Sequence, residues 1–380
     1  MRPSLRKIDR RTVLRETRRI VVKIGSAVIT GSRGALNARR VHHLADQVSA
    51  LCDAGHEVIV VSSGAISAGV GELALPRRPA TMPDLQAVAA VGQSRLIRTY
   101  NDCFRRHGRR VGQVLLSRED MEDRGRFLNT RNTLWSLVKM GCVPIINEND
   151  TVCVEEIRYG DNDFLAAHLA TLMLANLLVI LTTVDGLYAT GGPGRRRVLR
   201  VVEQVSDDVL DLADGRKSTV GSGGMESKLQ AAAIITKAGV PVVMADGRRR
   251  NILADVVAGK SVGTLFLPAA RRMASRKRWI GFTARPRGHV TVDEGARQAL
   301  VERGKSLLAS GVRAVHGDFE KGDVVALTVG HTTPFARGLT NYSSRELSLI
   351  QGYHTRDIQA RLGYKDYDEV VHRDNLVLLD

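Results

Sequence analysis

Two lysines in this sequence stand where each could meet an anion. Lys23 lies in the apolar run "IVVKI" at residues 20–24, directly before a glycine. A lysine inside an apolar strand costs free energy unless an anionic group meets it, although an ammonium group that reaches the surface is the alternative. Lys228 ends the run "GSGGMESK" that begins at Gly221, and it lies in the first turns of a helix predicted to reach Lys237. Backbone amides and a lysine at the positive end of a helix suit a polyphosphate.

Three further motifs place small or polar residues after apolar runs. "SSGAISAGVG" at residues 62–71 lets backbone amides approach an anion closely, and a tight structural turn explains it equally well. "INENDTV" at 146–152 and "GDNDF" at 160–164 concentrate Asn and Asp between apolar segments. These side chains can hold the ammonium and carboxylate of an amino acid or position a cationic residue. They are also common in ordinary turns.

Other phosphate-binding and catalytic patterns are absent. "AGKS" at 258–261 and "RGKS" at 303–306 resemble the end of a P-loop, but Ala254 and Ala299 stand where its first Gly is required. "GVGELA" at 69–74 does not directly follow a predicted strand, so it is not a dinucleotide fingerprint. No Ser/His/Asp or Cys/His pair suggests a covalent nucleophile. Phosphoryl transfer needs only positioning and cancellation of charge, which lysines, Mg²⁺ and amides provide. The motifs therefore favour a kinase outside the P-loop class.

The motifs need a scaffold that brings them together, and residues 20–268 predict one. Short β-rich runs alternate there with longer helical patterns, such as Asn37–Ala54, which Gly55 terminates. Continuous apolar strands separated by helices predict a largely parallel sheet with helices on both faces. Ligands of such sheets bind beyond the carboxyl ends of the strands, where every motif above falls. The predicted strands are residues 20–24, 57–63, 111–117, 143–149, 177–183 and 240–247.

Composition changes after Pro268. Short β signals and turns over residues 288–380 predict a small β-rich domain, joined to the first by a basic linker at 269–287. Most of the net charge of +16 lies in residues 1–19 and 271–287. We interpret the first as a disordered, dispensable extension and the second as a solvated linker. A nucleic-acid or acidic-lipid partner is the alternative explanation for such charge.

The thiols and the apolar segments bear on the compartment. The four cysteines form no CxxC pair, and no apolar segment follows the basic N-terminus, so we expect reduced thiols in a cytoplasmic protein. The stretch between Asp163 and Asp185 carries no charge. It is better explained as a buried helix followed by the strand "LLVILTT" than as a membrane span.

The order of the motifs resembles that of the glutamate 5-kinases, in the amino acid kinase superfamily. The segments that carry the resemblance are "VVKIGSAV", "VIVVSSGAISAG", "MEDRGRFLNTRNTL", "VPIINENDTV", "LTTVDGLY" and "GSGGMESKLQAA". In the C-terminal part, "VTVDEGA", "GDFEKGDVV" and "VVHRDNLVLL" resemble the PUA domain of bacterial members. The resemblance runs from about Ile20 to the C-terminus. It implies a three-layer α/β sandwich of the amino acid kinase fold for 20–268 and a PUA domain for 288–380.

The resemblance also implies a reaction and a site. ATP, with Mg²⁺, would phosphorylate the γ-carboxylate of L-glutamate to γ-glutamyl phosphate, the first step of proline biosynthesis. Lys23 and Lys228 would stabilise the transferring phosphoryl group, and Asp163 would orient them. Glutamate would be bound by Ser63, Asp150 and Asn162. The nucleotide would be held by Lys23, Thr182, Thr183, Gly221, Ser222, Gly223, Gly224, Met225 and Lys228. No side chain is assigned to a metal.

The same resemblance implies inhibition by proline, a homo-oligomer (dimer or tetramer) and glutamate-5-semialdehyde dehydrogenase as a partner. Thr183 departs from the Asp usual in the family, and "ATGGPG" after Tyr188 departs from the usual continuation, so nucleotide preference is open. A sister kinase of the superfamily is the nearest alternative. An RNA-binding or RNA-modifying protein is another, but aromatic residues are only 4% of the chain, which argues against stacking on bases. We therefore expect the PUA domain to be structural or regulatory.

Overall fold

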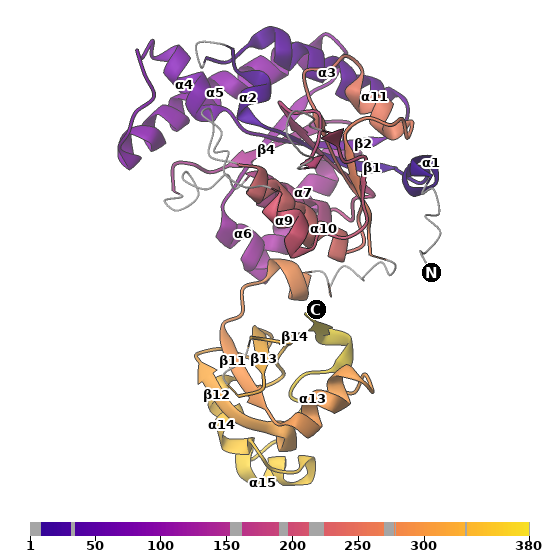
Figure 1. The fold of residues 1–380 in the computed structure, drawn as a ribbon. Coiled ribbons are helices and arrows are strands. Elements are labelled where there is room, and N and C mark those ends of the chain that lie inside the picture. The colour runs from indigo at the N-terminus through magenta and orange to yellow at the C-terminus, as the bar shows by residue number, and fades with distance from the viewer. Residues whose placement is uncertain are drawn as a thin grey trace. The chain divides into compact units, whose positions relative to one another are not determined.

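The computed structural model describes residues 9–31, 35–152, 162–189, 197–212, 224–269, 277, 279–330 and 333–379. The chain forms two compact units (Figure 1). Unit 1 comprises Met1–Met121 and Gly125–Arg272, and unit 2 comprises Glu122–Arg124 and Met273–Asp380. None of the helices in the described part of the chain combines the length and the apolar character that a membrane span requires.

Unit 1 contains an eight-stranded sheet with the order β3-β4-β2-β1-β5-β9-β10-β8. Neighbouring strands run parallel, except that β10 is antiparallel to β9. The largely parallel sheet predicted from the sequence is therefore confirmed. The strands are β1 (Arg19–Ile24), β2 (Glu57–Ser62), β3 (Val111–Leu116), β4 (Val143–Glu148), β5 (Leu177–Thr182), β8 (Val201–Val202), β9 (Val242–Asp246) and β10 (Thr264–Phe266). A separate ribbon pairs β6 (Tyr188–Ala189) with β7 (Arg197–Val198).

Helices cover this sheet in two groups. The described helices of the chain up to β10 are α1 (Arg10–Leu14), α2 (Ser26–Ile29), α3 (Ala38–Asp53), α4 (Ala65–Glu72), α5 (Met82–Arg105), α6 (Arg118–Glu122), α7 (Arg124–Lys139), α8 (Asn162–Leu172), α9 (Asp207–Asp211), α10 (Met225–Lys237) and α11 (Ile252–Val257). Helix α3 packs against α5 and α11, whereas α8 packs against α10 and β1. In Figure 1, α3 and α11 lie on one side of the strands and α9 and α10 on the other.

The alternation of side chains along β1 decides which group each residue meets. Ile20, Val22 and Ile24 belong to the core cluster that contains the apolar face of α3. Because successive strand residues point to opposite faces, Lys23 points away from α3 and toward the group that contains α8. The central strand thus presents its one ammonium group to a single helical layer.

Two glycines allow helices α4 and α5 to touch backbone to backbone. A Cβ atom at Gly69 would lie 1.9 Å from the carbonyl oxygen of Val88, and one at Gly92 would lie 1.8 Å from that of Ala65. No side chain fits at either position. The turn before α4 requires a third glycine, since Gly64 has φ of 108°. This packing fixes the turn that follows β2.

Part of the N-terminal segment is ordered, contrary to the expectation of disorder over residues 1–19. Residues 10–14 form α1, and Leu14 is buried in the core with 2% of its surface exposed. The guanidinium of Arg10 is also buried and donates to the carbonyl oxygen of Val262 at 2.7 Å. Burial lowers the pKa of Arg10, and the positive charge of Arg200 adds to that effect. Residues 1–8 lie outside the described part of the chain.

Unit 2 holds a five-stranded sheet with the order β12-β11-β13-β14-β15, and the predicted small β-rich domain is confirmed. The strands are β11 (Gly288–Val292), β12 (Val312–Gly317), β13 (Val324–Thr328), β14 (Ala336–Leu339) and β15 (Leu376–Leu378). In the described part of unit 2, the α-helices α13 (Glu294–Val301), α14 (Ser344–Ile350) and α15 (Ile358–Leu362) accompany them. They were not anticipated from the sequence.

The end of the predicted solvated linker is buried. Trp279–Thr283 form a π-helical turn in which Trp279 is 3% exposed and Ile280 is fully buried. This turn packs on β14 and β15 of unit 2. The described end of the segment 269–287 therefore belongs to the second unit, and residues 270–276 lie outside the described part.

Candidate active site

Lys23 is the centre of a buried ion cluster in unit 1. Its strand β1 is flanked on both sides by parallel strands, β2 and β5, and the residue is only 3% exposed. The Nζ atom lies 2.6 Å from Oδ1 of Asp163. The sequence-based expectation that an anionic group meets this lysine is confirmed, and the alternative of an ammonium group at the surface is wrong.

Asp163 is the carboxylate that joins the cluster. It is the second residue of α8 and is completely buried. While Oδ1 faces Lys23, Oδ2 accepts hydrogen bonds from Nζ of Lys228 at 3.1 Å and from Oγ of Ser227 at 2.9 Å. One carboxylate thus lies between two ammonium groups that come from β1 and α10.

The start of α10 holds Lys228 in place. Gly224 is the N-cap residue, and its carbonyl oxygen accepts from Oγ of Ser227 and from Nζ of Lys228, both at 3.0 Å. A lysine in the first turns of a helix faces the positive end of the helix dipole, which is unfavourable unless an anion compensates. Asp163 supplies that anion, because α10 packs against α8.

Among the described residues, the charges of this cluster sum to an excess of positive charge. Burial lowers the pKa of Lys23 to about 8, although Asp163 opposes the shift; the charge on Lys228 lowers it further. Burial alone would raise the pKa of Asp163, but the ammonium groups of Lys23 and Lys228 hold it below its usual range. Two cations therefore share one anion in a site that water barely reaches. Such a site is prepared to accept a further negative charge.

The three residues predicted to bind glutamate lie at the carboxyl ends of strands or beside the cluster. Ser63 directly follows β2, and its amide donates to the carbonyl oxygen of Ile24 at 3.1 Å, one residue beyond Lys23. Asp150 lies two residues after β4. Asn162 begins α8, next to Asp163, and its Oδ1 is buried without a hydrogen-bond partner in the described part of the chain. An unpartnered buried amide oxygen is free to accept from a ligand.

Two of the residues predicted to hold the nucleotide, Thr182 and Thr183, lie at the end of β5, on the other side of β1. Thr182 ends β5, and its carbonyl oxygen accepts from the amide of Gly247 at 2.9 Å. The carbonyl oxygen of Thr183 accepts from the guanidinium of Arg248 at 2.8 Å, which Asp246 holds in turn. Gly224 and Met225 start α10, while Gly221, Ser222 and Gly223 lie outside the described residues.

The order of the strands explains this division. From β1 the chain proceeds to β2 and β4 on one side, and later to β5 and β9 on the other. Ligands of open α/β sheets bind where the strand order reverses in this way. Lys23 on β1 lies at that switch point, between the two predicted groups of binding residues.

Two polar residues of this region were not predicted. Ser227 donates to Asp163 and precedes Lys228, so a hydroxyl one residue before the helix lysine was the available signal. Asn147, within "INEND", is 3% exposed, and its Nδ2 has no hydrogen-bond partner in the described residues. Its Oδ1 accepts from the amide of Glu148 at 2.9 Å, so its amide donors make no hydrogen bond to any described residue.

The sequence profile of the amino acid kinase family matches residues 18–246, and that of the PUA domain matches residues 288–362. The chain therefore belongs to the amino acid kinase family and carries a PUA domain in its C-terminal part. A glutamate 5-kinase from Syntrophotalea carbinolica is 48% identical, covering 97% of this chain and 99% of the relative. One from Geobacter sulfurreducens is 47% identical, with coverage of 97% and 99%. Within the family, the chain belongs to the glutamate 5-kinases.

Among solved structures, the carbamate kinase from Giardia lamblia is 17% identical, with a TM-score of 0.48, and covers 67% of this chain and 99% of that chain.

Proposed function

We propose that the protein transfers the γ-phosphoryl group of ATP to the γ-carboxylate of L-glutamate, which gives γ-glutamyl phosphate and ADP and begins proline biosynthesis. The observation that carries the proposal is that the buried ammonium groups of Lys23 and Lys228 both contact the carboxylate of Asp163. The names of the relatives that match nearly the whole chain support the choice of glutamate.

The cluster suits phosphoryl transfer because that reaction asks the protein mainly for position and charge. A carboxylate oxygen of glutamate attacks the γ-phosphorus, and the bond from that phosphorus to the β,γ-bridging oxygen breaks, so that ADP leaves with the electron pair. No proton has to be removed from the nucleophile. The two ammonium groups stabilise the charge on the phosphoryl oxygens, and Asp163 holds both lysines at 2.6 and 3.1 Å in the required arrangement.

The surrounding groups match the two substrates. For glutamate, the carboxylate of Asp150 suits the α-ammonium group, and the amides of Asn162 and Asn147 with the hydroxyl of Ser63 can hydrogen-bond its carboxylates. For ATP, the threonines at the end of β5 and the N-terminus of α10 can contact the nucleotide, because backbone amides at the start of a helix bind phosphate. The residues proposed for the nucleotide are Lys23, Thr182, Thr183, Gly221, Ser222, Gly223, Gly224, Met225 and Lys228.

Mg²⁺ would be held chiefly by ATP. Both oxygens of Asp163 face ammonium groups, so this carboxylate is a poor ligand for a second cation. Mg²⁺ ordinarily keeps several waters and takes phosphate oxygens as ligands. When bound, it neutralises charge on the β- and γ-phosphates.

Regulation and partners belong to the same proposal. Proline would inhibit by binding at or across the glutamate site. The chain would form a homo-oligomer (dimer or tetramer) in the cytoplasm. The acyl phosphate is labile, so glutamate-5-semialdehyde dehydrogenase would consume it. The PUA domain would serve a structural or regulatory role rather than RNA binding.

The decisive assay traps the acyl phosphate with hydroxylamine, using purified protein, ATP, Mg²⁺ and L-glutamate, with and without proline. We expect glutamate-dependent hydroxamate that decreases when proline is added. Product with aspartate or carbamate instead of glutamate would assign the chain to a sister kinase. Hydroxamate that proline leaves unchanged would retain the reaction and reject the inhibition. Steeply salt-dependent RNA binding at sub-micromolar affinity would contradict the role proposed for the PUA domain.

A further inference from the structure

A second cluster of titratable side chains lies in unit 1, between helix α3 and the residues that follow α5. His42 and Asp46 are four residues apart on α3, so they share one face of that helix. His107 lies two residues after the last residue of α5, and its Nε2 is 2.7 Å from Oδ1 of Asp46. Nδ1 of His42 lies 3.1 Å from the same oxygen. One ligand atom from each of the three residues lies within 4.8 Å of the others.

The hydrogen bonding of His42 is incomplete. Its Nε2 lies 2.7 Å from Nη1 of Arg106, and an arginine can only donate, so Nε2 accepts and the neutral ring carries its proton on Nδ1. That Nδ1 is shielded from solvent and makes no hydrogen bond of acceptable geometry in the described residues, despite the proximity of Asp46. A buried donor without a proper acceptor costs free energy. The ring is therefore held from one side only.

We propose that His42, Asp46 and His107 bind a divalent transition-metal ion, with Zn²⁺ as the first choice, in competition with Arg106. Two imidazole nitrogens and one carboxylate oxygen, with water in a fourth position, form a common zinc ligand set. Ligand bonds of about 2.0–2.2 Å in a tetrahedron separate neighbouring ligand atoms by roughly 3.3–3.5 Å. The present separations from Asp46 Oδ1, 2.7 Å to His107 and 3.1 Å to His42, are both slightly shorter than that value, and the ligand atoms of all three residues lie within 4.8 Å of one another, so small side-chain rotations suffice.

The ion and Arg106 exclude one another. Binding through Nδ1 of His42 places the ring proton on Nε2, which then cannot accept from the guanidinium. The positive charge of Arg106 also repels a divalent cation. Arg106 is exposed and follows the end of α5, so its side chain can move into solvent. His42 can therefore contact either the guanidinium of Arg106 or the metal ion, but not both at once.

This site is separate from the proposed kinase site. Helix α3 packs on the face of β1 that carries Ile20, Val22 and Ile24, whereas Lys23 points to the opposite face. A metal ion bound here would join α3 to the end of α5 without a ligand from the kinase cluster. Its expected effect is a rise in the melting temperature, because a ligand that binds the native state stabilises it.

The test titrates the full chain with Zn²⁺ alone, after removal of metals with a chelator and without nucleotide, by isothermal calorimetry and thermal unfolding. We expect one saturable site per chain and a rise in melting temperature. His107→Ala should weaken binding at least about tenfold, since loss of outer-sphere partners alone costs about 10–100-fold. Asp46→Asn should do the same. Arg106→Ala should tighten binding severalfold, because it removes the competing cation.

The matched control is His43→Ala, since His43 is the next residue on α3 and contacts Gln47 instead of the cluster. It should bind Zn²⁺ as the unaltered chain does. Equal affinity of the His43 and His107 variants would assign the zinc to other groups, such as the cysteines, and overturn the proposal. Absence of saturable binding, or an Arg106 variant that binds more weakly, would overturn it as well. The Arg106 variant retains all three ligands, so its result does not depend on a ligand variant that folds.

Discussion

Both units of the molecule contain lysine–aspartate pairs, and two of these pairs, Lys23–Asp163 and Lys321–Asp366, behave in opposite ways. In unit 1, Nζ of Lys23 lies 2.6 Å from Asp163, and burial lowers the pKa of the lysine to about 8 in spite of that contact. In unit 2, Nζ of Lys321 lies 3.1 Å from Asp366, with side chains 48% and 56% exposed. There the hydrogen bond that the ammonium group donates to Asp366 raises the pKa of the lysine. The partner is an aspartate in both pairs, so the exposure to solvent decides whether the pKa of the lysine rises or falls.

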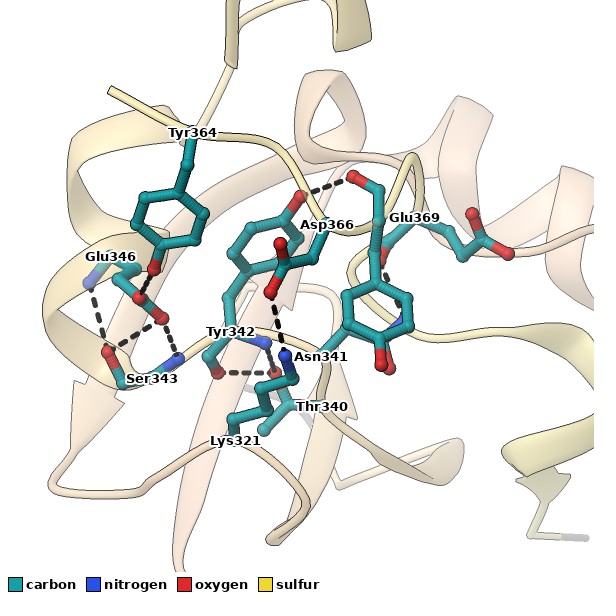
Figure 2. Close-up of polar contacts among 10 residues, drawn as sticks. Lys321, Thr340, Asn341, Tyr342, Ser343, Glu346, Tyr364, Asp366 and Glu369 are labelled. Atoms are coloured by element: carbon teal, nitrogen blue, oxygen red, sulfur yellow. Dashed lines mark hydrogen bonds and ion pairs between the residues drawn. The ribbon is translucent and has the colours of Figure 1, made fainter. Parts of the chain in front are cut away.

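The surroundings of the second pair show what it does. Figure 2 shows Lys321 reaching Asp366, while Tyr364 donates to Glu346 of α14. Asn341 donates to the carbonyl oxygen of Glu369 at 3.0 Å. These contacts attach the segment 364–369 to the sheet and to α14. The charges of Lys321 and Asp366 balance one another and both side chains are exposed to solvent, so the pair stabilises a loop and needs no ligand to complete it.

The difference separates an ion pair that only stabilises the fold from a buried cluster that is suited to bind an anionic ligand. A balanced exposed pair gains little from its Coulomb attraction because water screens it. In the part of unit 1 that the structure describes, two buried cations share one carboxylate, which is costly, and a bound phosphoryl group would offset the remaining positive charge. We therefore expect substitutions in the buried cluster of unit 1 to change catalysis and stability together, and those in the exposed network of unit 2 to change stability at most.

The largest effect should follow Asp163→Asn, which leaves two buried ammonium groups without their counter-charge. We expect a loss of about 3 kcal/mol or more in the free energy of unfolding, the usual cost of breaking a buried pair. Asp366→Asn should cause no measurable loss. Urea denaturation measures both, and the two tryptophans allow the units to be followed separately. Trp135 reports on unit 1 in a Trp279→Phe background, and Trp279 reports on unit 2 in a Trp135→Phe background.

Equal losses in the two asparagine variants would contradict the comparison, because burial would then have no influence on the worth of the pair. A stable Asp163→Asn protein would mean that the two lysines shed their charge or that water enters the cluster. Either result would remove the excess positive charge on which the proposed function rests.

Lys228→Ala should reduce kcat by about 10²-fold or more, since loss of one preorganised charge at a transition state costs about that much. Its KM values should change less. The hydroxamate assay under saturating substrates measures the effect. Lys237→Ala is the matched control, because Lys237 is exposed in the last turn of the same helix, and Lys321→Ala is the control from unit 2. An unchanged kcat in Lys228→Ala would reject its role.

The sequence could locate most of the scaffold for this cluster. Strand β1 and helix α10 were predicted almost to their observed bounds, because an uninterrupted apolar run and a glycine-rich helix start are strong local signals. The pairing of Lys23 with Asp163 joins residues far apart in the chain, and only the resemblance to a family indicated it. Ser227 escaped because a lone serine in a helix is usually solvated or bonded to its own backbone.

Short or composite segments were the ones that failed. Helix α1 has five residues, which is too few to show a helical period, and its arginines concealed the anchoring role of Leu14. The turn Trp279–Thr283 was hidden in the same way by the basic residues around it. In both cases, net charge suggested solvation, while one or two apolar side chains determined the packing.

Alkaline pH should weaken catalysis in a manner that the exposed pair does not share. Lys23 acts as a cation, so kcat/KM should fall about tenfold per pH unit once pH rises above about 8, its lowered pKa. The decline in kcat should begin at higher pH, since bound phosphate raises the pKa of the lysine. Lys23→Arg, which stays charged, should be slower at neutral pH and lack this alkaline decline. The pH profiles of both proteins and of Lys321→Ala measure it. An alkaline limb that persists in Lys23→Arg would assign it to another group.

The smallest effect concerns the network of unit 2. Ser343 caps α14 by accepting from the amide of Glu346, whose carboxylate returns a contact to the amide of Ser343 at 2.7 Å. Ser343→Ala should cost about 1 kcal/mol of unfolding free energy in unit 2, the usual worth of an N-cap. Ser348→Ala is the control from the same helix, because Ser348 bonds only back to the carbonyl of Ser344, a contact that contributes little. Neither variant should change kcat or proline inhibition if this network is purely structural. A Ser343→Ala variant that keeps its fold but loses proline inhibition would show that unit 2 influences the kinase site. The conclusion that the network of unit 2 is purely structural would then be wrong.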